Sequence, residues 1–460
     1  MKTHRKVQTP HTFVILVCIM IAAAVATYFI PAGEFERCKN SVGETLVVAG
    51  SYHEVASHPE SLLAIPGTIY RGIVEAASTV TFILMIGGAF EIITSTGTIA
   101  ALCHKLSKLF VHRKYLIIPV FLTLFSVFGF TMGMSAEVMI FVPFGITLAL
   151  SLGLDKVTGV AMIALGAATG FTAGLLNPFN VGVAQDIAEL PMFSGFGYRA
   201  FILLVLLAID TAYIVYYARK VNRHPEKSII YDLQEEREYA FSEEDGILTL
   251  RKALILLIMA VGFAALIYGL SMCGWYFEEM SALFLAMGII CGFANGYGPN
   301  KIASVFGTGV KNIVIGALIV GMARSINIIL EDASVIDTII YCISEIVNVM
   351  PHSLQAISMF LAQSLVNCLI TSGSGQAVVM MPIMVPIADL IGISRQTAVL
   401  AFQLGDGFSN SVLPTSASLM GYLAVSKIPY TKWLRFMMPL FLIWTIFGCL
   451  FMVGAVVIGY

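Results

Sequence analysis

The sequence predicts an all-α protein that crosses a membrane many times. Of its 460 residues, 58% are hydrophobic and 12% are charged, which is about half the charge content of a typical soluble domain. Its mean hydropathy is +0.88. Apolar runs of about 20 residues recur from Thr12 to the end, and a helix of that length crosses the hydrocarbon core of a bilayer. We therefore exclude a soluble protein.

The composition also disfavours other classes of function. The formal net charge of −2 leaves no basic patch for nucleic acid, so no nucleic-acid partner is expected. The eight cysteines are scattered, mostly within apolar runs, and lack the spacing of a zinc site. All eight histidines lie at or outside the ends of the expected helices, where they cannot serve a membrane-embedded enzyme. No cofactor is expected, and an enzyme is the least favoured alternative.

The first expected element is a transmembrane helix within residues 1–32. The basic start, Met1–Lys6, precedes an apolar stretch that is too long for a signal peptide and has no cleavage site. We place its N-terminus in the cytoplasm and the protein in the inner (cytoplasmic) membrane.

The rest of the chain is expected to form two halves joined by a polar linker. We expect a first repeat at 60–219, a cytoplasmic linker at 220–248, scaffold helices at 249–294 and a second repeat at 300–460. Each repeat is expected to hold one re-entrant hairpin and one broken transmembrane helix. The hairpins are placed at 115–152 and 353–391, and the broken helices at 156–190 and 396–426.

The distribution of Lys and Arg favours these hairpins, because cytoplasmic loops hold the excess of basic residues. If both hairpins return to the side they came from, 20 of the 26 Lys and Arg lie on the cytoplasmic side. Arg324 then lies within the membrane and Tyr460 on the outer side. The five basic residues on the outer side are Arg37, Lys39, Arg71, Arg199 and Arg395.

The two halves resemble each other in the order of their motifs. The segments 131–137 and 170–180 of the first half are echoed by 371–376 and 407–416 of the second. The first hairpin would enter from inside and the second from outside. The repeats would therefore have inverted topology, as in many secondary transporters.

Each hairpin arm has about 15 residues and is too short to cross the core, so the chain should turn inside the membrane. Glycines and hydroxyls suit such a turn because they accept unusual dihedral angles and satisfy freed backbone groups. An ordinary helix with small residues for close packing is the alternative. The residues of the two tips are Thr131, Gly133 and Ser135, and Ser372, Gly373, Ser374 and Gln376.

The helix breaks place a proline beside amides or hydroxyls within long apolar runs. Proline removes a backbone hydrogen bond, and its polar neighbours should then line a cavity. Half-helix ends would direct partial charges at one point near the bilayer midplane. A simple proline kink is the alternative. The residues concerned are Asn177, Pro178 and Asn180, and Asn410, Pro414, Thr415 and Ser416.

Ionisable residues at membrane depth are candidates for function because burying them is costly. Glu137 and Asp406 flank the expected cavity. Glu91 and Arg324 occupy nearly equivalent positions in the two repeats, so either a structural Glu91–Arg324 ion pair or a role in binding is expected. Arg71 and Glu75 stand four residues apart and are expected to pair on the surface.

The chain also resembles a known family. The segments 10–13 and 28–35, the hairpin tips and the paired breaks look like those of YfcC-type proteins, in the anaerobic C4-dicarboxylate carrier-like (DcuC-like) family of the ion transporter superfamily. The resemblance covers nearly the whole chain. It implies a homodimeric elevator transporter with a scaffold domain and a mobile domain that holds both hairpins and both broken helices. Relatives bind sodium with Ser-Asn-Thr tips, and this chain lacks that Asn.

The resemblance implies either basic amino acid exchange, such as arginine for ornithine, or carboxylate transport coupled to sodium or protons. Three deep acids and one Arg favour a cationic amino acid. Its carboxylate would then lie near Ser135 and Ser374 and its cation near Glu137 or Asp406. A coupling sodium ion would lie near the same residues. A channel, which would need a continuous polar path, is a further alternative.

Overall fold

The computed structural model describes residues 12–39, 45–233 and 249–460. Within these residues, nine helical stretches are long and apolar enough to cross a membrane. The chain is therefore a multi-pass helical membrane protein, as the sequence predicts. The nine stretches are Ala77–Ser95, Arg113–Met132, Lys156–Ile187, Phe196–Arg223, Leu250–Gly269, Phe277–Ala294, Pro299–Asp332, Gly373–Ile391 and Tyr430–Ile458.

The first helix, α1 (Thr12–Ala26), lies within the segment where the sequence predicts a transmembrane helix. Four short strands that the sequence did not predict follow it. Strand β1 (Gly33–Glu34) pairs antiparallel with β4 (His53–Glu54), and β2 (Arg37–Lys39) pairs antiparallel with β3 (Thr45–Val47).

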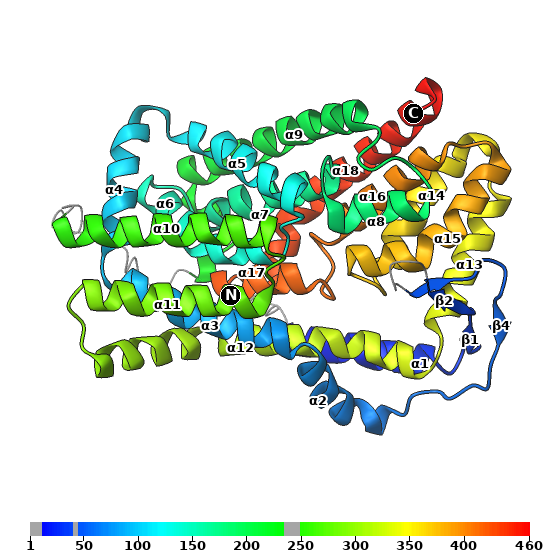
Figure 1. Ribbon diagram of the computed structural model, residues 1–460, viewed down its shortest axis with the longest axis horizontal. Coiled ribbons are helices and arrows are strands. Elements are labelled where there is room, and N and C mark those ends of the chain that lie inside the picture. The colour runs from blue at the N-terminus through cyan, green and yellow to red at the C-terminus, as the bar shows by residue number, and fades with distance from the viewer. Residues whose placement is uncertain (1–11, 40–44, 234–248) are drawn as a thin grey trace, which may run out of the picture.

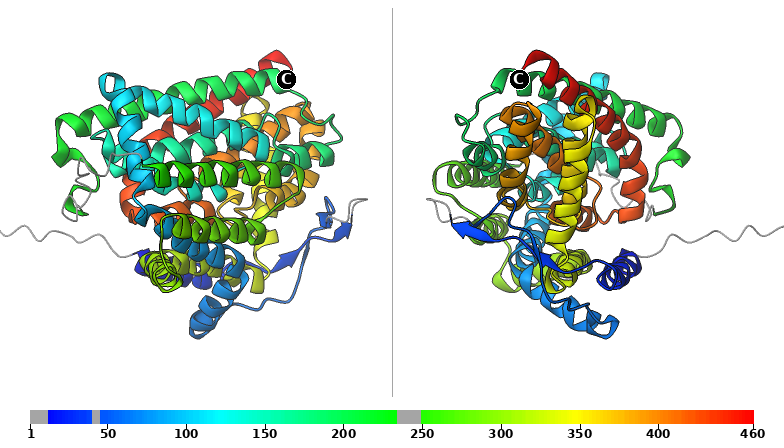
Figure 2. Two further views of the ribbon diagram at one scale, coloured as in Figure 1. Left: turned by 60° about the vertical axis from the view of Figure 1, so that its left-hand side comes forward. Right: turned by 90° about the vertical axis from the view of Figure 1, so that its right-hand side faces the viewer.

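Helices α2 (Ile65–Glu75) and α3 (Ala77–Ser95) run antiparallel to α12 (Pro299–Asp332) along one side of the molecule (Figures 1 and 2). Small residues allow the close approach. A Cβ added at Gly72 would lie 2.5 Å from the backbone oxygen of Gly321, and one at Gly87 would lie 1.9 Å from Ile313. A short 3-10 turn, η1 (Leu62–Ala64), precedes α2.

This antiparallel packing makes the expected Glu91–Arg324 ion pair wrong. Glu91 faces Gly309 of α12, and Gly309 and Arg324 are about 22 Å apart along a helix that rises 1.5 Å per residue. Arg324 instead pairs with Glu75 at 3.0 Å and with Glu331 at 3.2 Å.

The expected Arg71–Glu75 pair is wrong for the same reason. Arg71 donates two hydrogen bonds to Asp332, from Nη1 at 2.5 Å and from Nη2 at 2.9 Å. Both α2 side chains therefore pair across to α12 rather than along their own helix.

The first predicted hairpin is formed by α5 (Ile117–Met132) and α6 (Val142–Ser151), with a 3-10 turn, η3 (Glu137–Phe141), between them. Aromatic rings join the two arms, and Phe121 lies 6.0 Å from Phe144 between ring centroids. Before the hairpin come α4 (Thr98–Phe110) and a 3-10 segment, η2 (Val111–Leu116).

Both arms of this hairpin reach the same end of the molecule. Just before α5, Lys114 Nζ donates to Asn222 Oδ1 at 2.7 Å, and just after α6, Asp155 accepts from the Tyr217 hydroxyl at 2.7 Å. Asn222 and Tyr217 lie in the last turns of α9 (Phe196–Arg223). We call this the basic end and define it by the end of α9 and the start of α18 (Tyr430–Ile458), where Lys432 pairs with Asp232.

The second predicted hairpin is formed by α14 (His352–Val366) and α15 (Gly373–Ile391). The expectation that each arm is too short to cross a membrane is wrong for α15, which has 19 residues and is long and apolar enough to do so. It lies at the opposite end of the molecule (Figure 1), next to α13 (Ile336–Val349). The residues after α15 lie beside the start of α9 and the C-terminus. There the Gln396 amide donates to the Tyr460 hydroxyl at 3.2 Å, and that hydroxyl donates to Gly195 O at 3.1 Å. We call this the far end. The two hairpins therefore enter from opposite ends, and the inverted-repeat relationship stays a prediction.

Both predicted helix breaks are present. In the first half, α7 (Lys156–Ala173) stops, a π-helical turn, η4 (Pro178–Gly182), follows, and α8 (Val183–Ile187) continues. In the second half, α16 (Arg395–Ser409) stops before α17 (Ala417–Ser426). Each hairpin packs closely on the broken helix of its own half. A Cβ at Gly129 would lie 2.2 Å from Ala167 O, and one at Gly405 would lie 2.5 Å from the Gln363 side chain.

The linker is described only in part. After α9, two 3-10 turns, η5 (Pro225–Lys227) and η6 (Tyr231–Leu233), cover the basic end. Residues 234–248 of the expected linker lie outside the described residues. The expected scaffold helices follow as α10 (Leu250–Met272) and α11 (Phe277–Ala294). The division into repeats and scaffold stays a prediction.

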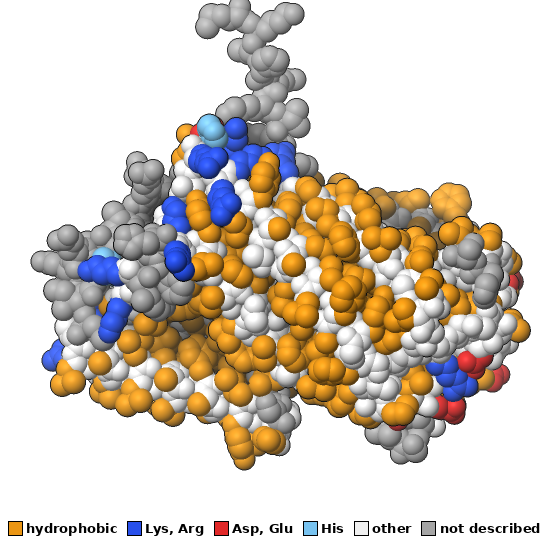
Figure 3. Space-filling model, turned by 90° about the horizontal axis from the view of Figure 1, so that it is seen from above, with side chains coloured by type: hydrophobic (Ala, Val, Ile, Leu, Met, Phe, Trp, Pro, Cys, Tyr) orange, Lys and Arg blue, Asp and Glu red, His pale blue; other side chains and the backbone are white. Residues whose placement is uncertain are grey.

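The surface separates charge from apolar side chains. Seen from above, a broad hydrophobic face covers the middle of the molecule, with Lys and Arg gathered towards the left end (Figure 3). The right end carries a smaller group in which basic and acidic side chains lie together. An apolar band between two charged ends is what a membrane-spanning protein presents to lipid.

Candidate functional site

The first hairpin tip contacts the first helix break. Gly133 ends α5 in the left-handed conformation (φ 63°), and a Cβ there would lie 2.7 Å from Asn177 Oδ1. The backbone N–H of Leu176 donates to Phe130 O at 3.0 Å. Asn177 is fully buried, and its Oδ1 accepts from Phe179 N at 3.0 Å, which caps the turn that Pro178 begins. Capping satisfies a donor that the break leaves free.

The same tip also contacts the start of α17. The hydroxyls of Ser135 and Ser418 lie 3.0 Å apart. Glu137 turns back on the tip, where its Oε2 accepts from Ser135 N at 3.0 Å. Glu137 is half-buried and forms no ion pair with a described residue. The tip of one half thus lies against the broken helix of the other.

The second cluster is centred on Asp406, whose side chain is fully buried in α16. Its Oδ2 accepts from Asn180 Nδ2 at 2.7 Å, and its Oδ1 accepts from Asn410 Nδ2 at 2.8 Å. Gly373, the first residue of α15, lies against this pair, because a Cβ there would be 2.8 Å from Asn180 Nδ2 and 3.1 Å from Asp406 Oδ2. Both breaks and the second tip therefore meet at one carboxylate.

Further contacts hold the second tip on the second break. Thr371 donates to Thr415 O at 3.5 Å, and Thr415 donates to Cys368 O at 3.4 Å. Asn367, just before the tip, donates to Asp406 O at 3.1 Å. Within the hairpin, Gln376 Nε2 donates to Gln363 Oε1 at 2.7 Å.

Several buried polar atoms in these two clusters have no hydrogen-bond partner among the described residues. A buried polar atom without a partner costs about 1–3 kcal/mol, so this group of atoms is available to an ion, a water molecule or a substrate. Asn180 and Asn410 donate from their amide nitrogens to the Asp406 carboxylate, and Asn367 donates to the backbone oxygen of Asp406. The amide oxygen of each has no partner among the described residues. The unpartnered atoms are Asn177 Nδ2, Asn180 Oδ1, Asn367 Oδ1, Gln376 Oε1 and Asn410 Oδ1.

Other residues expected at the site make hydrogen bonds within their own segment, and their role at the site stays a prediction. The Thr131 hydroxyl bonds back to Val127 O of its own helix at 2.6 Å. Ser372 is an exposed N-cap that accepts from Gly375 N at 3.3 Å, and Ser374 is also exposed. Ser416 caps α17 by accepting from Leu419 N at 3.4 Å. The prolines act through the backbone: Pro178 starts the π-helical turn, and Pro414 lies within the second break.

Sequence reasoning missed Asp210 and the burial of Arg199. Asp210, fully buried in the middle of α9, accepts from the Thr169 hydroxyl and from Trp444 Nε1 at 2.8 Å. A single acid within an apolar run was the signal that could have found it. Arg199, which the sequence places on the outer side, lies in the first turn of α9, and its side chain is fully buried. Its Nη1 donates to Ala173 O at 3.5 Å, and its Nε and Nη2 lack a partner among the described residues.

Asn367 and Ser418 were also missed. Asn367 lies just before the second predicted tip, and Ser418 lies just after the second predicted break. A polar residue within reach of such a turn was a usable signal, but only the packing of the two halves shows which of these residues face the site.

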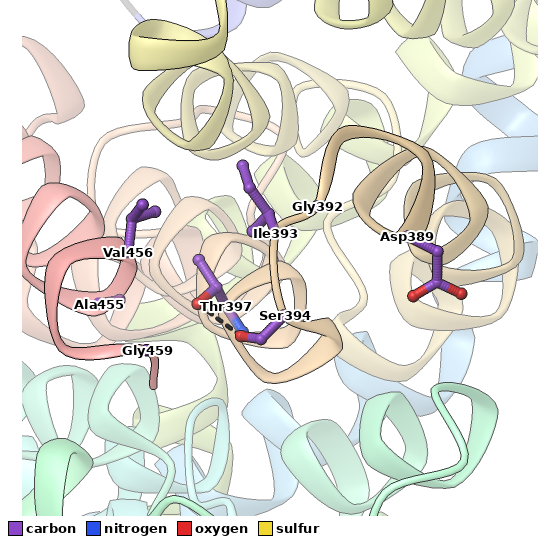
Figure 4. A pocket seen from close by; sticks show the side chains of 8 residues that line it. All are labelled: Asp389, Gly392, Ile393, Ser394, Thr397, Ala455, Val456 and Gly459. Carbon is purple, nitrogen blue, oxygen red and sulfur yellow. Dashed lines mark hydrogen bonds between the residues drawn. The ribbon is translucent and has the colours of Figure 1, made fainter.

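The described residues include no group of three or more His, Cys, Asp or Glu placed to hold a metal ion. A cavity of about 400 Å³ lies at the far end, between the residues after α15 and the end of α18. Figure 4 shows its lining, in which Ser394 and Thr397 are joined by a hydrogen bond of 2.9 Å. None of the sequence-predicted site residues lines it.

The chain matches the model of the C4-dicarboxylate anaerobic carrier family (DcuC) over residues 9–457. The chain belongs to this family. It is 31% identical to YfcC of Escherichia coli (strain K12), whose name proposes a basic amino acid antiporter, over 100% of this chain and 98% of that protein. It is 29% identical to an uncharacterized protein of Haemophilus influenzae, over 98% of this chain and 96% of the relative. This multi-pass member of a carrier family is a membrane transporter.

Two solved structures show a weaker likeness. The YdaH transporter of Alcanivorax borkumensis is 14% identical with a TM-score of 0.45, covering 98% of this chain and 99% of that one. MtrF of Neisseria gonorrhoeae, described as an antimetabolite efflux pump, is 15% identical with a TM-score of 0.41, covering 98% and 96%. Neither TM-score is high enough to establish a shared fold.

Proposed function

We propose that this transporter is a secondary active antiporter of basic amino acids, of the arginine and ornithine type. The observation that carries the proposal is Asp406, a buried carboxylate with no basic residue within hydrogen-bond distance among the described residues. Amide oxygens without partners lie beside it. A carboxylate surrounded by oxygens suits a cationic group, because it supplies acceptors for the donors of an ammonium or guanidinium. The name of the YfcC relative supports the same substrate class.

The carboxylate of the substrate would bind at the N-termini of two helices. Gly373 starts α15 beside Asp406, and Ser416 caps the start of α17. Helix N-termini carry a partial positive charge and free N–H groups, which favour a carboxylate. A zwitterion with a cationic side chain would thus have its cation at Asp406 and its carboxylate at these helix starts.

We further propose alternating access by an elevator movement of a homodimer. The close packing of each hairpin on its own broken helix, at Gly129 and Gly405, supports the view that these elements move as one body. The coupling ion is proposed to be a proton or a sodium ion. The oxygen-rich surroundings of Asp406 suit a hard cation as well as an amino acid side chain.

Transport of a C4-dicarboxylate is the second candidate, and Arg199 favours it. This buried cation belongs to the first turn of α9, its Nη1 donates to Ala173 O at the end of α7, and its other two nitrogens have no hydrogen-bond partner among the described residues. A carboxylate could accept from them. The description of the matching family names the same class of substrate.

Exchange assays with the purified protein in liposomes distinguish the two candidates. Liposomes loaded with arginine should take up labelled ornithine with saturable kinetics, and unlabelled arginine should compete. Uptake of labelled succinate and fumarate is measured in the same liposomes for comparison. Saturable uptake of a dicarboxylate, and of no basic amino acid, would reject the antiporter proposal in favour of the second candidate. A rate that rises linearly with concentration, without counterflow, would indicate a channel.

A further inference from the structure

A cavity at the basic end is not explained by transport. It has a volume of about 590 Å³ and lies between the last turns of α9, residues 225–233 and the first turns of α18. Both helices leave the apolar region of the protein here. Four basic side chains line the cavity, Lys220, Lys227, Lys432 and Arg435.

Positive charge predominates in this cavity. Of the two acids in its lining, Asp232 already pairs with Lys432 Nζ at 2.6 Å, and Glu226 lies 3.2 Å from His224. Three lining cations form no ion pair with a described residue, and they are Lys220, Lys227 and Arg435. The cavity thus offers several cationic donors to an anion.

Tyrosines accompany the cations. Tyr213 and Tyr217 line the cavity with their hydroxyls bonded to Phe436 O and Asp155. Tyr216 and Tyr231 also line it, and both side chains are exposed. Tyrosine gathers where a protein meets the boundary between lipid tails and headgroups, because its ring is apolar and its hydroxyl is polar. The exposed tyrosines of the cavity thus favour a position at the level of the headgroups.

An apolar track leads from the cavity along α18. Met438, Leu442, Ile446 and Leu450 follow one another at intervals of four residues, so they lie along one face of the helix. Their side chains are between 37% and 61% exposed. An acyl chain lying on this face would begin beside Arg435 and Pro439, which line the cavity.

We propose that this cavity binds the phosphate-bearing headgroup of an anionic phospholipid, with an acyl chain along the exposed face of α18. The headgroup chemistry is a phosphate ester held by Lys220, Lys227 and Arg435. Basic pockets between membrane helices on the cytoplasmic side suit such headgroups. Inorganic phosphate shares the charge but not the chains, and the apolar track favours the lipid.

The test is thermal unfolding and native mass spectrometry of the full chain in a neutral detergent. Phosphatidylglycerol or cardiolipin should raise the unfolding temperature and give lipid adducts, and phosphatidylcholine should not. Glycerol 3-phosphate and inorganic phosphate at the same concentration should have no effect. The double variant Lys220→Gln with Arg435→Gln should bind the anionic lipid at least tenfold more weakly, which corresponds to about 1.4 kcal/mol.

The matched control removes two exposed cations outside the cavity, Lys108→Gln with Lys311→Gln, and should bind the lipid like the original chain. Equal lipid binding by the cavity variant and the original chain would overturn the proposal. Equal stabilisation by phosphatidylcholine would also overturn it. Stabilisation by inorganic phosphate alone would show a site for a small anion instead. If the cavity variant fails to fold, Lys227→Gln alone, tested against Lys311→Gln, gives the same comparison.

Discussion

At the scale of single residues, Asp406 determines which substrate charge the site can hold. Its two oxygens each accept one amide hydrogen bond, from Asn180 and Asn410, and neither contacts a cation among the described residues. Glu137, the other acid expected at the cavity, instead turns back on its own hairpin tip at Ser135. Of the two acids, Asp406 therefore lies in the better position to hold a substrate cation.

We predict that Asp406→Asn weakens exchange of arginine or ornithine at least tenfold, about 1.4 kcal/mol. The amide keeps the size of the side chain but removes the negative charge that attracts the cation. Concentration-dependent exchange in liposomes measures the effect. Glu91→Gln, which removes an acid facing Gly309 on another helix, is the matched control. Unchanged exchange in Asp406→Asn would remove the main support for a cationic substrate.

Asp210 is predicted to be structural. It holds α9 to α7 and to α18 by accepting from Thr169 and Trp444. Asp210→Ala leaves both donors without an acceptor and should lower stability by about 1–3 kcal/mol for each donor. Asp210→Asn keeps one acceptor and should cost less. Thermal unfolding in detergent measures both variants, and an Asp210→Ala protein as stable as the original would contradict this role.

At the scale of elements, the hairpins and breaks depend on positions where a side chain would not fit. Gly133 ends α5 against Asn177, and Gly373 starts α15 against Asn180 and Asp406. Gly133 also needs a left-handed backbone, whereas Gly373 has ordinary helical geometry. Substituting Gly373 therefore changes the contact without straining the backbone.

Gly373→Ala should weaken substrate binding at least tenfold while leaving the unfolding temperature nearly unchanged. The added methyl would lie 2.8 Å from Asn180 Nδ2 and so displace the amide that bonds to Asp406. Alanine otherwise favours a helix by about 1 kcal/mol over glycine. Gly307→Ala is the matched control, because its Cβ would meet nothing within 4 Å. Equal affinity in the two variants would mean that the start of α15 does not shape the site.

At the scale of the whole molecule, the two ends of α18 lie at opposite ends of the protein. Lys432 near its start pairs with Asp232 after α9, and Tyr460 beyond its end bonds to Gly195 before α9. Helices α9 and α18 therefore run antiparallel. The linker and the C-terminus should face opposite sides of the membrane.

Thiol labelling of intact cells tests this topology. In a background without native cysteines, Val457→Cys near the C-terminus should react with an impermeant reagent, and Ser242→Cys in the linker should react only after lysis. Ser242 lies outside the described residues, and Val457 is exposed. The expectation follows from the excess of Lys and Arg on the linker side. If Ser242→Cys reacted in intact cells and Val457→Cys reacted only after lysis, the protein would have the opposite orientation in the membrane.

The sequence by itself determined where the chain crosses, turns and breaks. Pro178 and Pro414 with their polar neighbours indicated both breaks, and Gly133 and Gly373 with the hydroxyls beside them indicated both turns. These features depend on local chemistry, because proline removes a donor and glycine frees the backbone wherever they occur. The short strands after α1 were missed, since segments of two or three residues give almost no periodic signal.

Only the tertiary structure decided which side chains meet. The register of α2 and α3 against α12 determines that Arg324 pairs with Glu75 and that Glu91 faces Gly309. The packing of the two halves brought Asn180 to Asp406 and Ser135 to Ser418, more than 200 residues apart in each case. Such pairs depend on how helices cross and slide against one another. Residue spacing along one helix constrains contacts within three or four positions and carries no information about that register.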